Sequence, residues 1–404
     1  MRMSIIIKKK RLMEFMIEIS FMLLPFTLFL NPFLFNGVKL MGMGVINIFI
    51  DITFLLALID SNLRKKNYKD NFHIFYFFIL LLIVTLIKVS ISNSNFSAWF
   101  IAKQYYFLVP LVYISLCNKR IDIQKIIRVL CLETVIICPL SIYMFLTKNY
   151  FGSVMNEDLL KYDIVGTPFA RMFSIFGSPL VAGPFFSLIS MILIMQLKDK
   201  KIGTKVLLAL NCICLVLTFS RAALIALIVF CFVKFVSEKE MSSFKKTIST
   251  LMLVIIVIGT IIITSDKGAY FWKGDIFDNV RIGKWLSNIS GIFKHWFLGY
   301  DFALQISSTG TWESTLSDNS ILIALADFGI LFWGIISLLE LVRYCKKNEY
   351  DKRYFRPLIL AIFVMMILYD FVQVFPCNYI AILIYVYMKR NICNYNAKEG
   401  KVRE

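Results

Sequence analysis

Long apolar runs recur along the whole chain, and they constrain what it can fold into more than any other feature. A helix needs about 20 predominantly apolar residues to cross a bilayer. Of the 404 residues, 59% are apolar, against about 45–50% in an average soluble domain. The sequence therefore predicts an all-α, polytopic membrane protein in which residues 1–404 form a single integral membrane domain. We predict twelve transmembrane helices, at residues 12–30, 43–60, 72–92, 98–116, 126–146, 179–197, 206–219, 222–236, 247–264, 319–342, 357–374 and 376–388.

The positions of the basic residues predict the orientation of these helices. Most of the 44 Lys and Arg residues fall on alternate connections and at the two chain ends, in runs such as "LRKKNYK" and "KDKKIGTK". Cytoplasmic connections of membrane proteins retain Lys and Arg, so we expect both termini to be cytoplasmic. The basic residues that give the net charge of +18 then orient the chain in the bilayer, and we expect them to contact its anionic lipids. No nucleic-acid-binding motif is present, so nucleic acid is not an expected partner.

Two of the predicted outer connections are long, at residues 147–178 and 265–318. Long connections in compact proteins are usually functional or disordered, and neither has a disordered composition. The second contains "DNVRIGKWLSNISGIFKHWF", in which apolar residues recur at helical spacing. This pattern predicts an amphipathic helix that lies along the outer membrane surface.

A serine and an arginine interrupt the apolar stretch "LTFSRAAL", which runs from Leu217 to Leu224. An arginine within hydrocarbon costs about 2.5 kcal/mol or more on insertion scales. The predicted topology places Arg221 at the outer end of the hairpin between the seventh and eighth helices, where its side chain can reach water. Arg221 is either an interface anchor or part of a cluster with Arg171 and Arg281, the other two outer arginines. Such a cluster suits an anionic ligand, because the planar guanidinium donates two parallel hydrogen bonds to phosphate.

The stretch "GTPFARMFSIFGSPLVAGPFF" around Arg171 is rich in glycine and proline. Gly177, Pro179, Gly183 and Pro184 indicate either a kinked or broken helix whose backbone lines a cavity, or an ordinary helix start that contains proline.

Acidic residues gather at the mouth of the tenth predicted helix, in "TWESTLSDNSILIALADFGIL". Ser317 or Asp318 can cap that helix. Glu313 and Asp318 can alternatively act on a bound substrate. Asp327 lies nine residues further on, inside the apolar run, where an ionisable residue is either functional or paired with a nearby polar group.

Taken in order, these motifs resemble the O-antigen polymerase and O-antigen ligase family. The similarity rests on "R…FG-S-P…G" before a helix, "LTFSRAALIAL" across a hairpin, a long outer loop that contains an arginine, and "SDNSILIALADFGIL" after it. It covers roughly residues 165–345, and the order and topological side of the motifs carry it.

The resemblance implies a GT-C-like membrane glycosyltransferase that acts at the outer face of the cytoplasmic membrane of a bacterium. Such an enzyme transfers a growing glycan from undecaprenyl pyrophosphate to another lipid-linked repeat unit, so donor and acceptor are both undecaprenyl-pyrophosphate-linked oligosaccharides. It needs no cofactor, neither a nucleotide sugar nor a metal ion. The partner proteins that it implies are a chain-length regulator and a flippase.

The resemblance also assigns roles to the three outer arginines. The family's pyrophosphate-holding arginines carry over to Arg171, Arg221 and Arg281. The chemistry agrees, because negative charge grows on the leaving pyrophosphate and fixed positive donors stabilise it. Arg221 and Arg281 are therefore candidate catalytic residues, and Arg171 is a candidate substrate-binding residue.

The remaining candidate site residues come from the second outer loop and the helix that follows it. Glu313 and Asp318 are candidate catalytic residues, because the acceptor hydroxyl needs a base. Asn319, Trp285 and Trp312 are candidate substrate-binding residues. The tryptophans can stack on sugar faces or anchor the loop at the interface.

One departure from the family pattern favours a polymerase. Ligases usually carry a histidine directly before the asparagine that begins this helix, whereas Asp318 precedes Asn319 here. The sequence therefore predicts a polymerase that makes capsular polysaccharide or O-antigen. A ligase that transfers the finished glycan to another acceptor stays an alternative, as does a flippase or transporter of lipid-linked sugars. A transporter should carry polar residues along a central path through many helices.

Overall fold

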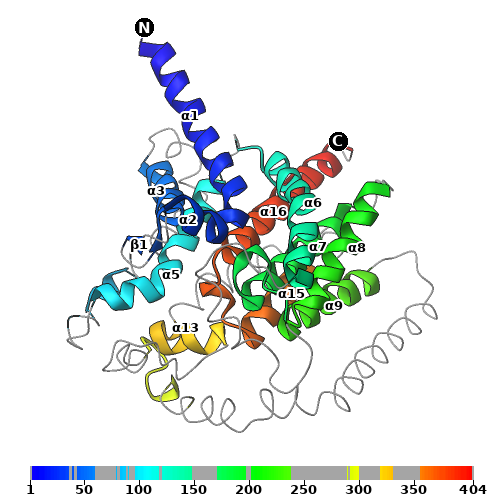
Figure 1. The fold of residues 1–404 in the computed structure, drawn as a ribbon. Helices are drawn as coiled ribbons and strands as arrows, with labels where there is room; N and C mark the ends of the chain where they lie inside the picture. The colour runs from blue at the N-terminus through cyan, green and yellow to red at the C-terminus, as the bar shows by residue number, and fades with distance from the viewer. Residues whose placement is uncertain are drawn as a thin grey trace.

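The computed structural model of the chain describes residues 2–35, 39–40, 43–59, 79, 82–87, 90, 96–117, 121–147, 171–196, 202–237, 289, 292–299, 319–330 and 355–402. Within these residues the regular secondary structure is helical (Figure 1), apart from one antiparallel pair of two-residue strands, β1 (Lys39–Leu40) and β2 (Met43–Gly44). The predicted all-α class is confirmed for this part of the chain.

The first predicted transmembrane helix, 12–30, is interrupted in the structure. Helix α1 (Arg2–Leu23) is followed by a short 3-10 turn, Leu24–Phe26, and then by α2 (Thr27–Phe35). Pro25 lies in this turn, and proline has no N–H to donate to a preceding helical turn. The Thr27 hydroxyl donates to the Leu24 carbonyl over 2.9 Å, which satisfies one backbone acceptor at the break.

The remaining helices follow the predicted apolar runs closely in the middle of the chain. The helices predicted at 179–197 and 222–236 begin and end within one residue of α7 and α9. The helices in chain order are α3 (Val45–Ile59), α5 (Phe96–Leu116), α6 (Ile123–Thr147), α7 (Pro179–Gln196), α8 (Ile202–Leu217), α9 (Arg221–Val236), α13 (Ser320–Phe328), α15 (Arg356–Leu368) and α16 (Cys377–Val402).

Three predictions near the C-terminal half are corrected by the structure. The helix predicted at 357–374 stops at Leu368, and a 3-10 turn follows at Phe371–Gln373. The helix predicted at 319–342 is interrupted, since α13 ends at Phe328. The cause is Gly329, whose φ of 62° lies outside the right-handed helical region. The predicted amphipathic helix has given way to a turn by residues 295–298, so Trp296 does not continue its helical face.

Helices α7 and α9 run side by side in the same direction. The Ser187 hydroxyl of α7 donates to the Ala223 carbonyl of α9 over 2.9 Å, and Lys234 Nζ donates to the Ile194 carbonyl over 3.4 Å. Helix α8 also packs against α7 and returns the chain to the start of α9, and α15 packs along α9. The starts of α7 and α9 and the end of α8 therefore lie at one end of the bundle. We call this the arginine end, because Arg171 and Arg221 lie there.

Helix α16 and the end of α15 reach the same end of the bundle. The Cys377 thiol, in the first turn of α16, contacts the Val181 carbonyl of α7 at 3.3 Å. A connection of only eight residues, 369–376, joins α15 to α16, so the end of α15 lies near the start of α16.

Charged side chains tie helices together at the opposite end. Lys125 of α6 forms an ion pair with Glu18 of α1 at 2.6 Å. Arg390 of α16 donates to the carbonyls of Leu116 and Ile121, which flank the α5–α6 connection, over 2.6 and 2.7 Å. Figure 1 shows both chain termini at this end and α13 at the far end.

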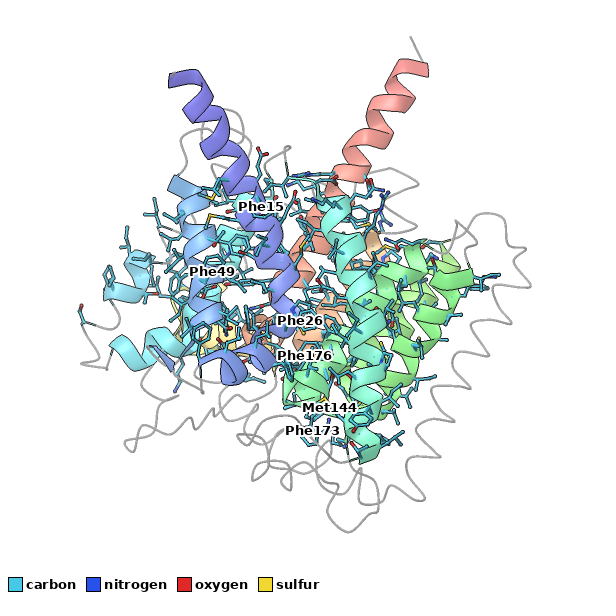
Figure 2. All side chains as sticks on the ribbon, turned by 45° about the horizontal axis from the view of Figure 1, so that its top comes forward. Phe15, Phe26, Phe49, Met144, Phe173 and Phe176 are labelled. Carbon is cyan, nitrogen blue, oxygen red and sulfur yellow. The ribbon has the colours of Figure 1, made fainter. Side chains whose placement is uncertain are left out.

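Three helical segments among the described residues are long and apolar enough to cross a membrane: Leu12–Asn31, Ile123–Thr147 and Pro179–Gln196. Apolar side chains also cover the outside of the bundle. Figure 2 shows Phe15 and Phe49 on the surface, where they are 57% and 41% exposed, and Phe176 in the interior. An apolar exterior over an apolar core is the arrangement that a lipid environment requires. These features characterise a membrane-associated protein.

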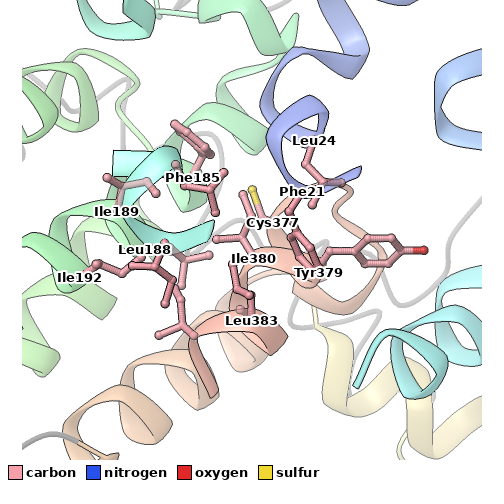
Figure 3. Close-up of a cluster of buried hydrophobic side chains, with 14 of the residues drawn as sticks. Phe21, Leu24, Phe185, Leu188, Ile189, Ile192, Cys377, Tyr379, Ile380 and Leu383 are labelled. Carbon is pink, nitrogen blue, oxygen red and sulfur yellow. The ribbon is translucent and has the colours of Figure 1, made fainter. Parts of the chain in front are cut away.

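The core lies where α7 and α16 cross. Figure 3 shows Phe185, Leu188, Ile189 and Ile192 of α7 facing α16 residues around Ile380. Helices α1 and α3 pack on the other side of α16, through Phe21 and Phe54. The middle of α7 thus packs against the start of α16, and this packing holds the connections at the arginine end in fixed positions.

Candidate functional site

The tight turn between α8 and α9 is the centre of the arginine end. The Thr218 hydroxyl donates to the Leu215 carbonyl over 2.6 Å and accepts from the Ser220 amide over 3.2 Å. Between them, Phe219 has a φ of 50°. A residue other than glycine in this region is strained by about 1–3 kcal/mol, and such strain is found most often at functional sites.

Arg171 docks directly on this turn. Its Nε donates to the Thr218 carbonyl over 3.2 Å, and its Nη2 donates to the Phe219 carbonyl over 3.4 Å. The neighbouring Met172 amide donates to the Leu217 carbonyl over 2.9 Å, which holds the backbone in place.

These contacts bring two of the three predicted arginines together. Arg221 follows Phe219 by two residues, and two residues span at most about 7 Å of chain. Both arginines are half-buried. The Arg171 guanidinium thus docks on the turn that Arg221 directly follows, although 50 positions separate the two residues in the sequence.

Helix α7 approaches the turn so closely that no side chain fits between them. A Cβ atom on Gly183 would lie 2.3 Å from Cβ of Ser220 and 3.2 Å from Oγ1 of Thr218. The helix is continuous from Pro179 to Gln196 despite Pro184, so the broken helix is wrong, and Pro179 is the first residue of the helix, as in an ordinary proline-containing start. The glycine in this stretch permits a close backbone approach rather than a break.

Helix starts add positive potential to the arginine end. Helices α7, α9 and α16 all begin there, and the unpaired amides of a helix start carry partial positive charge. Ser220, the residue that precedes α9, makes no side-chain capping bond. Backbone amides of this kind and arginines together form a favourable environment for an anionic group.

Asn319 caps α13, which corrects the prediction that Ser317 or Asp318 does so. Its Oδ1 accepts from the amides of Ile321 and Leu322, both at 3.0 Å. Asn319 is also buried. The side-chain amide oxygen of Asn319 is therefore bonded to the first turn of α13. This candidate substrate-binding residue thus has a structural role as well.

Ser320, the first residue of α13, joins this helix to the connection between α15 and α16. Its hydroxyl contacts the Tyr369 carbonyl at 3.2 Å and Oδ1 of Asp370 at 3.1 Å, and it accepts from the Val372 amide at 3.1 Å. The start of α13 is thereby tied to the end of α15, at the arginine end.

Asp370 is a carboxylate at this end that sequence reasoning missed. The predicted transmembrane helix 357–374 contains Asp370, whereas the structure places it in the connection after Leu368. A carboxylate inside an apolar run is a signal of function, and this signal in the run 357–374 could have identified Asp370 from the sequence.

Asp327 lies away from the solvent in the last turn of α13. It is fully buried, and the chain around Gly299 crosses close to it. A Cβ on Gly299 would lie 2.4 Å from the Ala326 carbonyl oxygen, and the Ile330 amide donates to the Trp296 carbonyl over 2.7 Å. Trp296 and Gly299, in the middle of the second predicted outer loop, therefore pack on the end of α13.

Five candidate residues lie outside the described part of the chain. They are Arg281, Glu313, Asp318, Trp285 and Trp312.

Among the described residues, no group of three or more His, Cys, Asp or Glu side chains is placed to hold a metal ion.

No protein-family model matches this chain, and no curated protein matches it.

Proposed function

We propose that the chain is a multi-pass glycosyltransferase of a bacterial cytoplasmic membrane. It polymerises undecaprenyl-pyrophosphate-linked oligosaccharide units into capsular polysaccharide or O-antigen at the outer face. The observation that carries the proposal is the docking of Arg171 on the turn between α8 and α9, which Arg221 directly follows. Both arginines were predicted to bind pyrophosphate, and they come from segments far apart in the sequence.

The surroundings of the two arginines suit a diphosphate. Guanidinium groups donate to phosphate oxygens in pairs, and the amides at the starts of α7 and α9 add dipoles of the same sign. A site at the bundle end, next to apolar helices, lies where the headgroup of a polyprenyl lipid meets the membrane surface. Arg281 is the third proposed member of this group.

The proposed reaction exchanges one bond at the anomeric carbon for another. A hydroxyl oxygen of the acceptor sugar attacks that carbon, and the bond from carbon to the pyrophosphate oxygen breaks. Pyrophosphate leaves with the electron pair, and the arginines stabilise its growing charge. A carboxylate takes the hydroxyl proton. Glu313, Asp318 and Asp370 are the candidates for this role.

The proposed membrane arrangement has twelve transmembrane helices with both termini in the cytoplasm. Two observations support it. Both termini lie at one end of the bundle (Figure 1), as an even number of crossings requires. That end also carries Lys125 of α6, together with Lys389 and Arg390 of α16, and cytoplasmic ends of membrane helices are enriched in basic residues.

Reconstitution with a lipid-linked repeat unit tests the proposal. The purified full chain is placed in liposomes with the undecaprenyl-pyrophosphate-linked oligosaccharide, and the products are separated by length. A ladder of products supports the polymerase. A single transfer to a lipid A core would establish the ligase instead, and translocation of the lipid without a new bond would establish the flippase.

A further inference from the structure

A buried hydrogen bond joins an N-terminal helix to the C-terminal helix inside the bundle. The Tyr379 hydroxyl of α16 donates to Oδ1 of Asp51 in α3 over 2.7 Å. Tyr379 is 0% exposed and Asp51 is 8% exposed. An ionisable side chain within an apolar bundle is costly, and it is retained where it serves a function. The transfer reaction proposed above uses neither residue.

Aromatic rings hold Tyr379 in one orientation. The rings of Phe54 and Phe375 meet it edge to face, with centroids 5.7 and 5.3 Å away, and the Tyr105 ring does so at 6.2 Å. Figure 3 shows the hydroxyl pointing away from the apolar cluster around Ile380. The direction of the hydroxyl is therefore fixed by packing, and its bond to Asp51 sets where the start of α16 lies.

From Tyr379 a continuous series of hydrogen bonds runs to the arginine end. The Tyr379 amide donates to Oδ1 of Asn378 over 2.8 Å, and Nδ2 of Asn378 donates to the Val372 carbonyl over 2.9 Å. The Val372 amide then donates to the Ser320 hydroxyl over 3.1 Å, and that hydroxyl contacts Oδ1 of Asp370 at 3.1 Å. Every step joins groups that are buried or half-buried.

We propose that Asp51 and Tyr379 are positioning residues that fix the connection 369–376 and, through it, Ser320 and Asp370. This inference rests on the proposed function, because the group that is positioned is part of the proposed transfer site. Asp51 and Tyr379 do not touch substrate. They act by holding the start of α16 against α3, so that Asn378 presents its amide to Val372.

The first test is independent of activity. Hydrogen–deuterium exchange is measured on the full chain in nanodiscs for the wild type and for Tyr379→Phe, which removes only the hydroxyl. We expect the amides of residues 369–378 to exchange about tenfold faster in Tyr379→Phe, while those of α7 to α9 stay unchanged. Tyr387→Phe removes a hydroxyl from the same helix outside this series and is the matched control. Unchanged exchange at 369–378, or an equal rise throughout the bundle, overturns the inference.

Two further variants keep the test decisive if Tyr379→Phe does not fold. Ser320→Ala breaks the series at its other end and should speed exchange at residues 369–374. Asp51→Asn keeps an oxygen that accepts from Tyr379, and its exchange should stay within twofold of the wild type. Slow exchange in Ser320→Ala, or fast exchange in Asp51→Asn, counts against the positioning role.

The second test concerns the reaction. In the polymerisation assay, Tyr379→Phe should lower kcat about tenfold and leave KM for the lipid-linked donor within twofold, because it displaces reacting groups without removing a binding group. An unchanged kcat, or a rise in KM alone, refutes the positioning role. A wild type without polymerase activity refutes the proposed function, and the exchange experiment still tests the hydrogen-bonded series.

Discussion

Gly183 of α7 lies against Ser220, the residue that precedes α9, with no room for a methyl group between them. A Cβ on Gly183 would approach the Ser220 Cβ to 2.3 Å. The two residues set the distance between α7 and the turn on which Arg171 docks and which Arg221 follows. The geometry of the candidate site therefore depends on the absence of one side chain.

Replacing Gly183 by alanine should move α7 away from this turn. Overpacking of a tight contact costs about 1–3 kcal/mol, so Gly183→Ala should lower the thermal unfolding midpoint of the detergent-solubilised protein and reduce chain extension. Gly203→Ala is the matched control, because nothing lies within 4 Å of a Cβ at that position. It should be neutral or stabilising by up to about 1 kcal/mol. Equal effects of the two substitutions would show that the close contact at Gly183 contributes neither to stability nor to chain extension.

Removing a guanidinium from the arginine end should stop chain extension. Arg221→Ala and Arg281→Ala should each abolish the product ladder without loss of the protein from the membrane, and lysine at either position should restore little activity because the paired donors are lost. Arg128→Ala is the control, since Arg128 is exposed on α6 toward the opposite end of the bundle. Full-length polymer from either alanine variant contradicts the role of that arginine.

The cap of α13 should respond to the chemistry of residue 319. Asn319→Ala removes the acceptor for two backbone amides and should cost about 1 kcal/mol of stability, whereas Asn319→Asp keeps an acceptor and should cost much less. The thermal unfolding midpoint of each variant measures the difference. An aspartate variant as unstable as the alanine variant would show that capping is not the role of this side chain.

The orientation of the chain can be tested with an impermeant thiol reagent on intact cells. A cysteine introduced as Gly310→Cys, in the second outer loop, should be labelled from outside, whereas Gln124→Cys, at the start of α6, should be labelled only after lysis. The unmodified chain gives the background from its own cysteines. The reverse pattern would overturn the proposed topology.

Local patterns in the sequence predicted the helices of the central segment well. Helices α7 and α9 follow apolar runs bounded by polar residues, and Ser220 and Arg221 mark the hairpin between α8 and α9. These are signals between near neighbours in the chain. The amphipathic pattern of the second outer loop and the long run at 319–342 predicted more helix than the structure has at residues 295–298 and at Gly329.

Contacts between distant segments were beyond a reading of the sequence. Nothing local marks Thr218 and Phe219 as the acceptors for Arg171, because the carbonyls of every residue are alike and only the fold selects a pair. The bond between Asp51 and Tyr379 joins residues 328 positions apart, with no spacing rule to predict it. The cap at Asn319 was missed for a different reason, since three adjacent residues all have suitable side chains.

The docking of Arg171 on the turn before α9 has a consequence for the energetics of any ligand there. A long, flexible side chain loses up to about 2 kcal/mol of rotamer entropy when it is immobilised, and that loss normally opposes binding. The carbonyls of Thr218 and Phe219 already hold this guanidinium, so the Arg171 side chain has lost its rotamer entropy on folding, before any ligand binds. If an anion binds here as proposed, it meets a preorganised partner in Arg171 and should bind more tightly than it would to a freely rotating arginine.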